Sequence, residues 1–189
     1  DGTGTVTTPN TPAAQHTIDG TFDIDNQFTQ VNLGENILTT GDAIGIGSST
    51  VLTANVTLIT TSGAAAGAAV SLAAVDATSA GTETLTIDGG TSGDVTISGL
   101  LGGTTRLGLT QVTTANDVDL TNNTAGTHRV AGLLVGVDNV TIGSGTESAV
   151  DTFGALDAID STNNVRIITD SANAGMGTIA ITLDGISID

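Results

Sequence analysis

A short motif recurs along this chain: Asn or Asp, an apolar residue, a polar residue and a second apolar residue. Apolar residues two positions apart lie on the same face of a β-strand, so each copy predicts a short strand with one buried face. The first copy reads Asn55-Val-Thr-Leu58, and further copies begin at Asp94, Asp117, Asn139 and Asn164. Close variants that lack the leading Asn or Asp are Leu85-Thr-Ile87, Ile179-Ala-Ile181 and Ile186-Ser-Ile188.

These strand signals are separated by turns rich in Gly, Asn, Asp and Ser. Successive strands lie roughly 10–15 residues apart, the spacing expected of stacked coils with two or three short strands each. The chain has three Phe and neither Trp nor Tyr, so its core is built from small aliphatic side chains. We therefore predict an all-β fold, a parallel β-solenoid of short strands and Gly/Asn/Asp turns. An antiparallel β-sandwich or jelly roll is the alternative.

The prolines divide the chain. Both of them, Pro9 and Pro12, fall in residues 1–17, which we predict to be an extended N-terminal arm or linker with a short strand around Val6 as one option. Residues 18–189 are predicted to form a single β-rich repeat domain.

Two segments fit the strand pattern less well. The stretch Ala64–Ala77 is rich in alanine, which makes a helix an option there. Apolar residues recur every three positions between Val150 and Ile159, which predicts either a short helix at about 149–160 or a strand plus turn in an irregular coil.

Charge limits the partners. The chain contains 20 acidic residues and only three basic ones, Arg106, Arg129 and Arg166, which gives a formal net charge of −17. Nucleic acid is an unsuitable partner because phosphate binding needs clustered Lys or Arg. No apolar run reaches the length that spans a bilayer. The acidic, cysteine-free composition is typical of an extracellular or cell-surface protein.

The most regular part of the chain resembles a known family. Residues 85–121 read LTIDGGTSGDVTISGLLGGTTRLGLTQVTTANDVDLT. This run resembles the strand-repeat regions of giant bacterial secreted surface proteins of the filamentous-haemagglutinin or adhesin type. The resemblance extends over about residues 51–145 and departs from the repeat at residues 108–111 and after Thr146. It implies a β-solenoid from an exported adhesin, fibre or surface layer, and it implies no catalytic residues.

Carboxylates provide the best chemical candidates. Asp19, Asp23 and Asp25 fall within seven residues, and strand alternation places Asp23 and Asp25 on one face. Asp88 and Asp94 flank a Gly-rich turn similar to calcium-binding repeat turns, with one residue too many. Hard oxygen ligands suit Ca²⁺, so these five residues are the candidate calcium ligands. The simpler interpretation is that they are solvated turn carboxylates.

Little in the sequence supports catalysis. There is no Cys, and the two histidines are His16, in the arm, and His128, which we interpret as an exposed turn residue. Carboxylates are too numerous for any pair to indicate a glycosidase. We therefore predict that the chain is not an enzyme and has no catalytic or cofactor-binding residues.

Asparagines at equivalent turns of a solenoid stack and hydrogen-bond from coil to coil. We expect this structural role for Asn55, Asn116, Asn139 and Asn164.

An open solenoid end exposes strand edges that pair with other chains. The strand signal continues to the last residues, Ile179–Asp189, which fits an excised array, head-to-tail stacking or an internally paired final strand. We expect a structural subunit or segment of an extracellular fibre, sheath or adhesin stalk that self-associates into a homo-oligomer or filament. An adhesin module that binds glycans or cell surfaces is the alternative, and a carbohydrate-active enzyme is the third option.

Overall fold

The computed structural model describes residues 4–8, 15–122, 128–135, 139–144, 152–153, 156–158 and 164–168. Over these residues the regular structure consists of strands in three parallel sheets, without a helix. The first sheet, here called sheet A, comprises β1 (Thr5–Thr7), β4 (Gln30–Leu33), β7 (Thr50–Leu52) and β10 (Val75–Ala77).

The other two sheets are larger. Sheet B comprises β2 (Gln15–Ile18), β5 (Asn36–Thr39), β8 (Val56–Ile59), β11 (Leu85–Asp88), β13 (Leu107–Thr114), β15 (Arg129–Val135), β17 (Thr152–Phe153) and β18 (Leu156–Ala158). Sheet C comprises β3 (Phe22–Ile24), β6 (Ile44–Ile46), β9 (Val70–Leu72), β12 (Val95–Ile97), β14 (Asp117–Asn122), β16 (Asn139–Ser144) and β19 (Asn164–Ile168).

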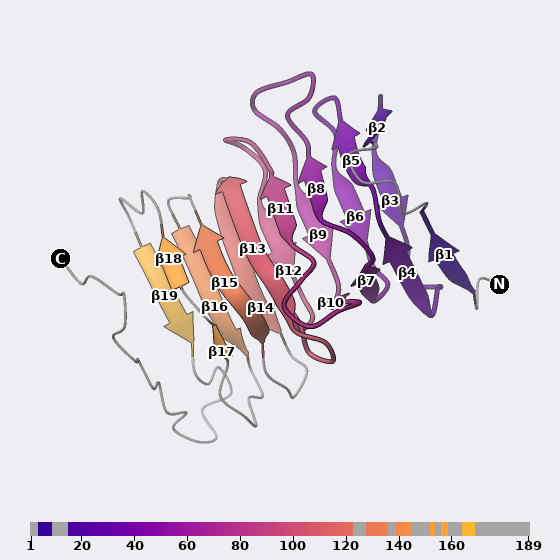
Figure 1. Ribbon diagram of the computed structural model, residues 1–189. Helices are drawn as coiled ribbons and strands as arrows, with labels where there is room; N and C mark the ends of the chain where they lie inside the picture. Colours follow the sequence, from indigo (N-terminus) through magenta and orange to yellow (C-terminus); the bar gives the residue numbers. More distant parts are fainter. Residues whose placement is uncertain are drawn as a thin grey trace.

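One passage of the chain around the sheets is one coil: the first four coils each visit the sheets in the order A, B, C, whereas the described strands from β13 on belong only to sheets B and C. Figure 1 shows the coils following one another from the N-terminal end toward the C-terminal end. Every strand pairing is parallel, as in β1 with β4 and β3 with β6. The predicted parallel β-solenoid is therefore confirmed, and the antiparallel sandwich alternative is wrong.

The recurring motif explains the stacking in sheet C. Four of its five copies are the successive strands β12, β14, β16 and β19, whose second residues Val95, Val118, Val140 and Val165 are register partners. The fifth copy, at Asn55, lies in sheet B, where Val56 pairs with Leu85 of the variant motif. One sequence pattern thus supplies the same strand in each coil.

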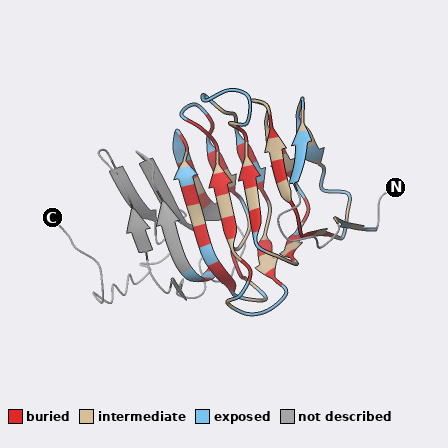
Figure 2. Ribbon diagram, turned by 45° about the horizontal axis from the view of Figure 1, so that its top comes forward, coloured by how far each residue is buried: buried red, intermediate tan, exposed pale blue. Residues whose placement is uncertain are grey.

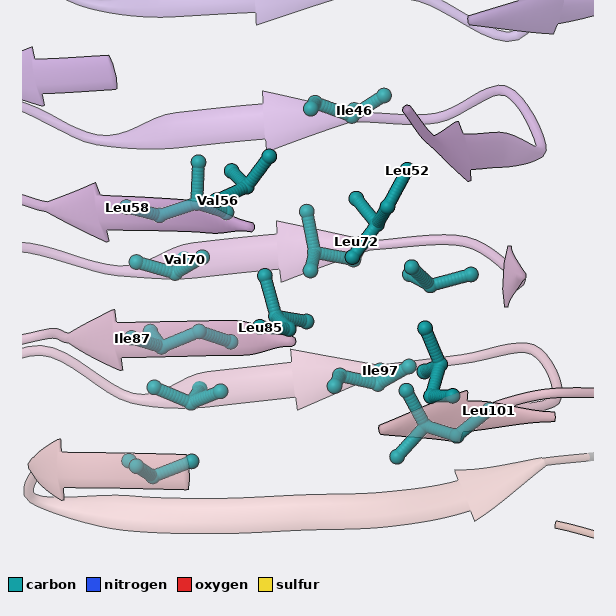
Figure 3. Close-up of a cluster of buried hydrophobic side chains, with 14 of the residues drawn as sticks. Ile46, Leu52, Val56, Leu58, Val70, Leu72, Leu85, Ile87, Ile97 and Leu101 are labelled. Atoms are coloured by element: carbon teal, nitrogen blue, oxygen red, sulfur yellow. The ribbon is translucent and has the colours of Figure 1, made fainter. Parts of the chain in front are cut away.

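The core consists of aliphatic columns that run through the coils. In sheet B, Ile37, Leu58, Ile87 and Val112 are register partners from coil to coil, and each is buried. Figure 3 shows side chains of β7, β8 and β9, among them Leu52, Leu58 and Leu72, gathered in the interior between the sheets. Small branched side chains fill this narrow interior, which explains why the chain needs few aromatics.

The coils differ in length because their turns differ. The shortest step covers the 19 residues between the register partners Val31 and Thr50, and the longest covers the 29 between Val56 and Leu85. The strands stay in register because the additional residues of the longer coils lie in the turns.

The helix option for the Ala-rich segment Ala64–Ala77 is wrong. This segment forms a turn followed by β9 and β10, and Val70, Leu72 and Val75 are buried in the core. Gly67 has a φ of +64°, a left-handed conformation that interrupts a helix. Pairing with the coils on both sides therefore overrides the helix propensity of alanine.

The helix option at about 149–160 is also wrong wherever the structure describes this segment. Thr152–Phe153 and Leu156–Ala158 form β17 and β18, which pair with β15. The strand-plus-turn alternative holds for these five residues, and the rest of the segment lies outside the described residues.

The predicted N-terminal arm contributes strands to the first coil. Its residues form β1, around Val6, and most of β2, which pair with β4 and β5.

The fifth coil replaces its sheet A strand with a turn. Only an isolated bridge between Val75 and Leu101 continues sheet A there. The Asp76 carboxylate of the preceding coil accepts the N–H groups of Thr104 and Thr105 at 2.7 and 2.9 Å. From the following coil, Arg129 Nε donates to the Gly102 carbonyl at 3.1 Å. Side chains thus hold this turn from both sides.

His128 belongs to the same region. Its side chain is fully buried, and its Nδ1 accepts the Leu101 N–H at 3.0 Å. The interpretation of His128 as an exposed turn residue is therefore wrong. Its position just before β15 places the ring over the turn that replaces the sheet A strand, where a backbone donor needs an acceptor.

Gly102 is expected to be intolerant of any side chain. Its φ is +67°, and an added Cβ would lie 2.0 Å from the Arg129 carbonyl oxygen. We expect Gly102→Ala to lower the free energy of unfolding by about 2–5 kcal/mol, from left-handed strain and overpacking together. Urea unfolding followed by circular dichroism measures this. Gly4→Ala is the control, since an added Cβ there meets nothing within 4 Å. Equal stability of the two variants would contradict the described turn.

Two fully buried threonines make a second comparison. Thr110 lies between Leu85 and Leu133 in a core column, and its hydroxyl has no hydrogen-bond partner among the described residues. The Thr60 hydroxyl accepts the Ala68 N–H at 3.0 Å and contacts the Ala68 and Asp88 carbonyls at 3.0 and 3.2 Å.

We expect Thr110→Val to raise the free energy of unfolding by about 1 kcal/mol, because it removes an unsatisfied buried hydroxyl and keeps the side-chain shape. Thr60→Val is expected to lower it by about 1–3 kcal/mol, because Ala68 N–H loses its acceptor. Thermal unfolding of both variants checks the pair. Destabilisation by Thr110→Val equal to that of Thr60→Val would refute the difference in environment.

Candidate interaction surface at the open first coil

The first coil leaves all three sheets open. Strands β1, β2 and β3 each stand at the end of their sheet, and none pairs on its outer edge with another strand of the described chain. Unpaired strand edges present rows of N–H and C=O groups that attract further strands. Because the three edges belong to one coil, they form one continuous surface.

The register shows which backbone groups face outward. Thr40 N donates to Ile18 O, and Phe22 N donates to Ala43 O, so Ile18 and Phe22 bond to the second coil. Residues alternate along a parallel strand between its two neighbours. The N–H and C=O groups of Thr17 in β2 and Asp23 in β3 therefore point to the open side.

The first coil also exposes the end of the core. The apolar side chains Val6, Ile18, Phe22 and Ile24 pack on the core but are only partly buried. Register partners in the second coil, such as Val31 and Ile46, have at most 1% of their surface exposed. Figure 2 shows the contrast between the exposed strand at the N-terminal end and the buried bands of the central strands. A partner that covered this end would bury apolar surface.

A polar pair lies at the same end. His16 occupies a core-facing register position, opposite the buried Ile37, yet 52% of its side chain is exposed. Its Nε2 contacts the Glu35 carboxylate, whose side chain is 5% exposed. Sequence reasoning placed His16 in the arm and missed Glu35. The alternation of Gln15-His-Thr-Ile18, with His16 and Ile18 two positions apart, is the signal that would have placed His16 on a strand.

The three candidate calcium ligands of the first coil make separate contacts. Asp19 Oδ1 accepts the Thr40 hydroxyl at 3.0 Å, and Asp25 Oδ1 accepts its neighbour Gln27 N–H at 2.9 Å. Asp23 lies over Gly45, where an added Cβ would be 2.8 Å from its Oδ1. These carboxylates therefore join the first coil to the second or shape its turns.

Asp88 and Asp94 lie further along the solenoid. The Asp88 carboxylate accepts the Gly90 N–H at 3.0 Å and the Thr61 hydroxyl at 2.8 Å. Asp94 Oδ1 accepts the Asn116 side-chain amide at 2.7 Å. Within the described residues, no three Asp, Glu or His side chains form a group that would hold a metal ion. Calcium binding by the five carboxylates stays a prediction.

The asparagines make coil-to-coil contacts of more than one kind. Asn116 donates to Asp94 of the preceding coil, and Asn55 Oδ1 accepts the Thr84 N–H of the following coil at 3.1 Å. Asn139 and Asn164 are register partners in sheet C. Asn36, which sequence reasoning missed, accepts the Thr57 N–H at 2.7 Å. Asn36, Asn55 and Asn116 therefore each bridge neighbouring coils, whereas the side chains of Asn139 and Asn164 lie outside the described part of the structure, so stacking there stays a prediction.

Hollows in the described surface include two that each contain an acidic residue. One, of about 480 Å³, contains Asp76 among small residues, and the other, of about 510 Å³, contains Asp88. Each hollow holds one carboxylate, and both carboxylates accept backbone N–H groups. A glycosidase needs two positioned carboxylates, so neither hollow offers that arrangement. The described part of the chain contains no helix long and apolar enough to cross a membrane.

Comparison with protein-family models, curated proteins and solved structures finds no match to this chain.

The open end predicts a gradient of protection along sheet C. Ile24 of β3 has one neighbouring strand, whereas its register partner Ile46 lies between two. We expect amides of β3 to exchange with solvent at least about tenfold faster than those of β6 and β9, because local opening there needs less free energy. Hydrogen-exchange mass spectrometry of the dilute, unassembled chain measures this. Equal protection of the first and third coils would show that the first coil is covered.

Proposed function

We propose that this protein is a structural subunit or segment of an extracellular fibre, sheath or adhesin stalk that assembles end to end. One observation carries the proposal: the three sheets end at the same coil, with outward backbone groups and a partly exposed apolar layer. Contacts between different ends of identical subunits do not close on themselves, so they build filaments.

The composition supports an extracellular setting. A cysteine-free chain with a net charge of −17 keeps its sides mutually repulsive, so association is directed to the ends. The resemblance of residues 85–121 to secreted adhesin repeats points the same way. Metal ions that screen the carboxylates would add lateral contacts, and calcium is the cation these oxygen ligands suit.

Blocking one outward backbone donor tests the proposal. We expect Thr17→Pro to abolish filaments, because proline removes the N–H that faces the open side. The variant retains the hydrogen bond from Thr40 N–H to the Ile18 carbonyl, which joins β2 to the second coil. Thr17→Ala keeps the N–H and is the matched control, so it is expected to assemble like the unmodified chain.

Electron microscopy and sedimentation velocity measure assembly, and circular dichroism verifies that both variants remain folded. Folded Thr17→Pro that assembles as well as Thr17→Ala would contradict pairing at the edge of β2. An unmodified chain that stays monodisperse at high concentration would contradict end-to-end assembly as a whole.

A further inference from the structure

An aspartate followed by a glycine is open to succinimide formation, in which the backbone nitrogen of the glycine attacks the side-chain carboxyl group of the aspartate. Glycine has no side chain to hinder this approach, and its backbone adopts conformations that other residues avoid. The described part of the chain contains two such pairs. Asp19-Gly20 lies in the turn between β2 and β3, whereas Asp88 ends β11 and Gly89 begins the turn that follows.

The first pair is accessible, and the nitrogen of its glycine is uncommitted. Asp19 is exposed in a turn of the open first coil. Gly20 has a φ of +128°, and its N–H has no hydrogen-bond partner among the described residues. An added Cβ at Gly20 would meet nothing within 4 Å, so the space around this turn is open. The Gly20 nitrogen can therefore approach the Asp19 carboxyl group without breaking a backbone hydrogen bond.

The second pair is held on both sides of the bond that would form. Gly89 is buried, and its N–H donates to the Thr114 carbonyl of the following coil at 2.8 Å. The Asp88 carboxylate accepts the Gly90 N–H at 3.0 Å and the Thr61 hydroxyl of the preceding coil at 2.8 Å. Attack at Asp88 therefore requires hydrogen bonds between coils to open first, and the reaction is slowed because the opened state is rare.

We propose that Asp19 is a site of spontaneous isomerisation to isoaspartate, and that the fold protects Asp88 from the same reaction. The Gly20 nitrogen forms a bond to Asp19 Cγ, and its hydrogen leaves with the carboxyl hydroxyl group as one water, which gives a succinimide ring. Water then adds to one ring carbonyl and breaks the bond from that carbon to nitrogen. Addition at the former main-chain carbonyl leaves the backbone running through Cγ, which is isoaspartate, whereas addition at Cγ restores aspartate. The overall change needs only water.

The new linkage alters the first coil. It lengthens the backbone between β2 and β3 by one methylene group and leaves the free carboxylate directly on Cα. The hydrogen bond from the Thr40 hydroxyl to Asp19 Oδ1, which joins the first coil to the second at 3.0 Å, is expected to be lost. We expect β2 and β3 to loosen at the edge that the proposed assembly uses. The modification site itself does not depend on that assembly.

Ageing of the folded full-length chain tests the site. The chain is kept at neutral pH and physiological temperature, digested, and analysed by electron-transfer dissociation mass spectrometry, which distinguishes isoaspartate from aspartate at each position. We expect at least about tenfold more isoaspartate at Asp19 than at Asp88, because Asp88 reacts only from a locally opened state. A sample unfolded in guanidinium chloride is expected to form isoaspartate at both positions at similar rates, because the dipeptides are identical.

Matched variants give a faster readout. Asparagine forms the same succinimide with loss of ammonia, so Asp19→Asn and Asp88→Asn report on the two positions in a shorter time. Circular dichroism verifies that both are folded, and folded Asp19→Asn is expected to react at least about tenfold faster than folded Asp88→Asn. Asp19→Glu keeps the carboxylate and is expected to remain unmodified at position 19, because its ring would need six members.

Two outcomes would overturn the proposal. One is an equal amount of isoaspartate at Asp19 and Asp88 in the folded chain, which would show that the fold does not protect Asp88. The other is an Asp19 that stays unmodified in the folded chain while it isomerises in the unfolded chain, which would show that the turn resists the reaction.

Hydrogen exchange of the aged chain measures the structural consequence. After digestion, peptides with isoaspartate and aspartate at position 19 separate by chromatography, so both forms are compared in one sample. Isoaspartate peptides that cover β2 and β3 are expected to exchange at least about threefold faster, because local opening there needs less free energy. Equal exchange would overturn the loosening of the two strands.

Discussion

Parallel pairing between successive coils is the interaction on which the rest of this structure depends. Each strand is only a few residues long and would not be stable alone. Pairing on both edges satisfies its backbone groups, and the aliphatic columns, such as Ile37, Leu58, Ile87 and Val112, bury their side chains between coils. Stability is therefore a sum over neighbouring coils, and each coil needs a neighbour on both sides.

That requirement is not met in the first coil, whose outer strand edges have no partner among the described strands. Its three strands have one neighbour each, its apolar layer is half covered, and His16 is exposed at a position that the core fills elsewhere. Inner coils tolerate insertions because the turns absorb them, and side chains such as Asp76 and Arg129 hold the irregular turn of the fifth coil. The first coil, by contrast, has no outer neighbour among the described strands, and the proposed assembly would supply one.

The sequence predicted the fold well because strand periodicity is local. Four copies of one motif stack in sheet C as the repeats indicate, and the aliphatic composition indicates a thin core. The Ala-rich segment was misjudged because pairing with adjacent coils overrides local propensity. The burial of His128 and the contact between His16 and Glu35 depend on which residues meet across coils 19 to 29 residues long, and unequal turns hide that register from the sequence.

The central claim is that coil-on-coil pairing continues from one molecule to the next. Fibre diffraction from aligned filaments of the full chain tests it most directly. The account predicts a strong reflection near 4.8 Å along the filament axis, since every strand would lie across that axis with parallel neighbours about 4.8 Å apart. Filaments whose 4.8 Å spacing lies perpendicular to the axis, or a chain that forms no filaments, would contradict it.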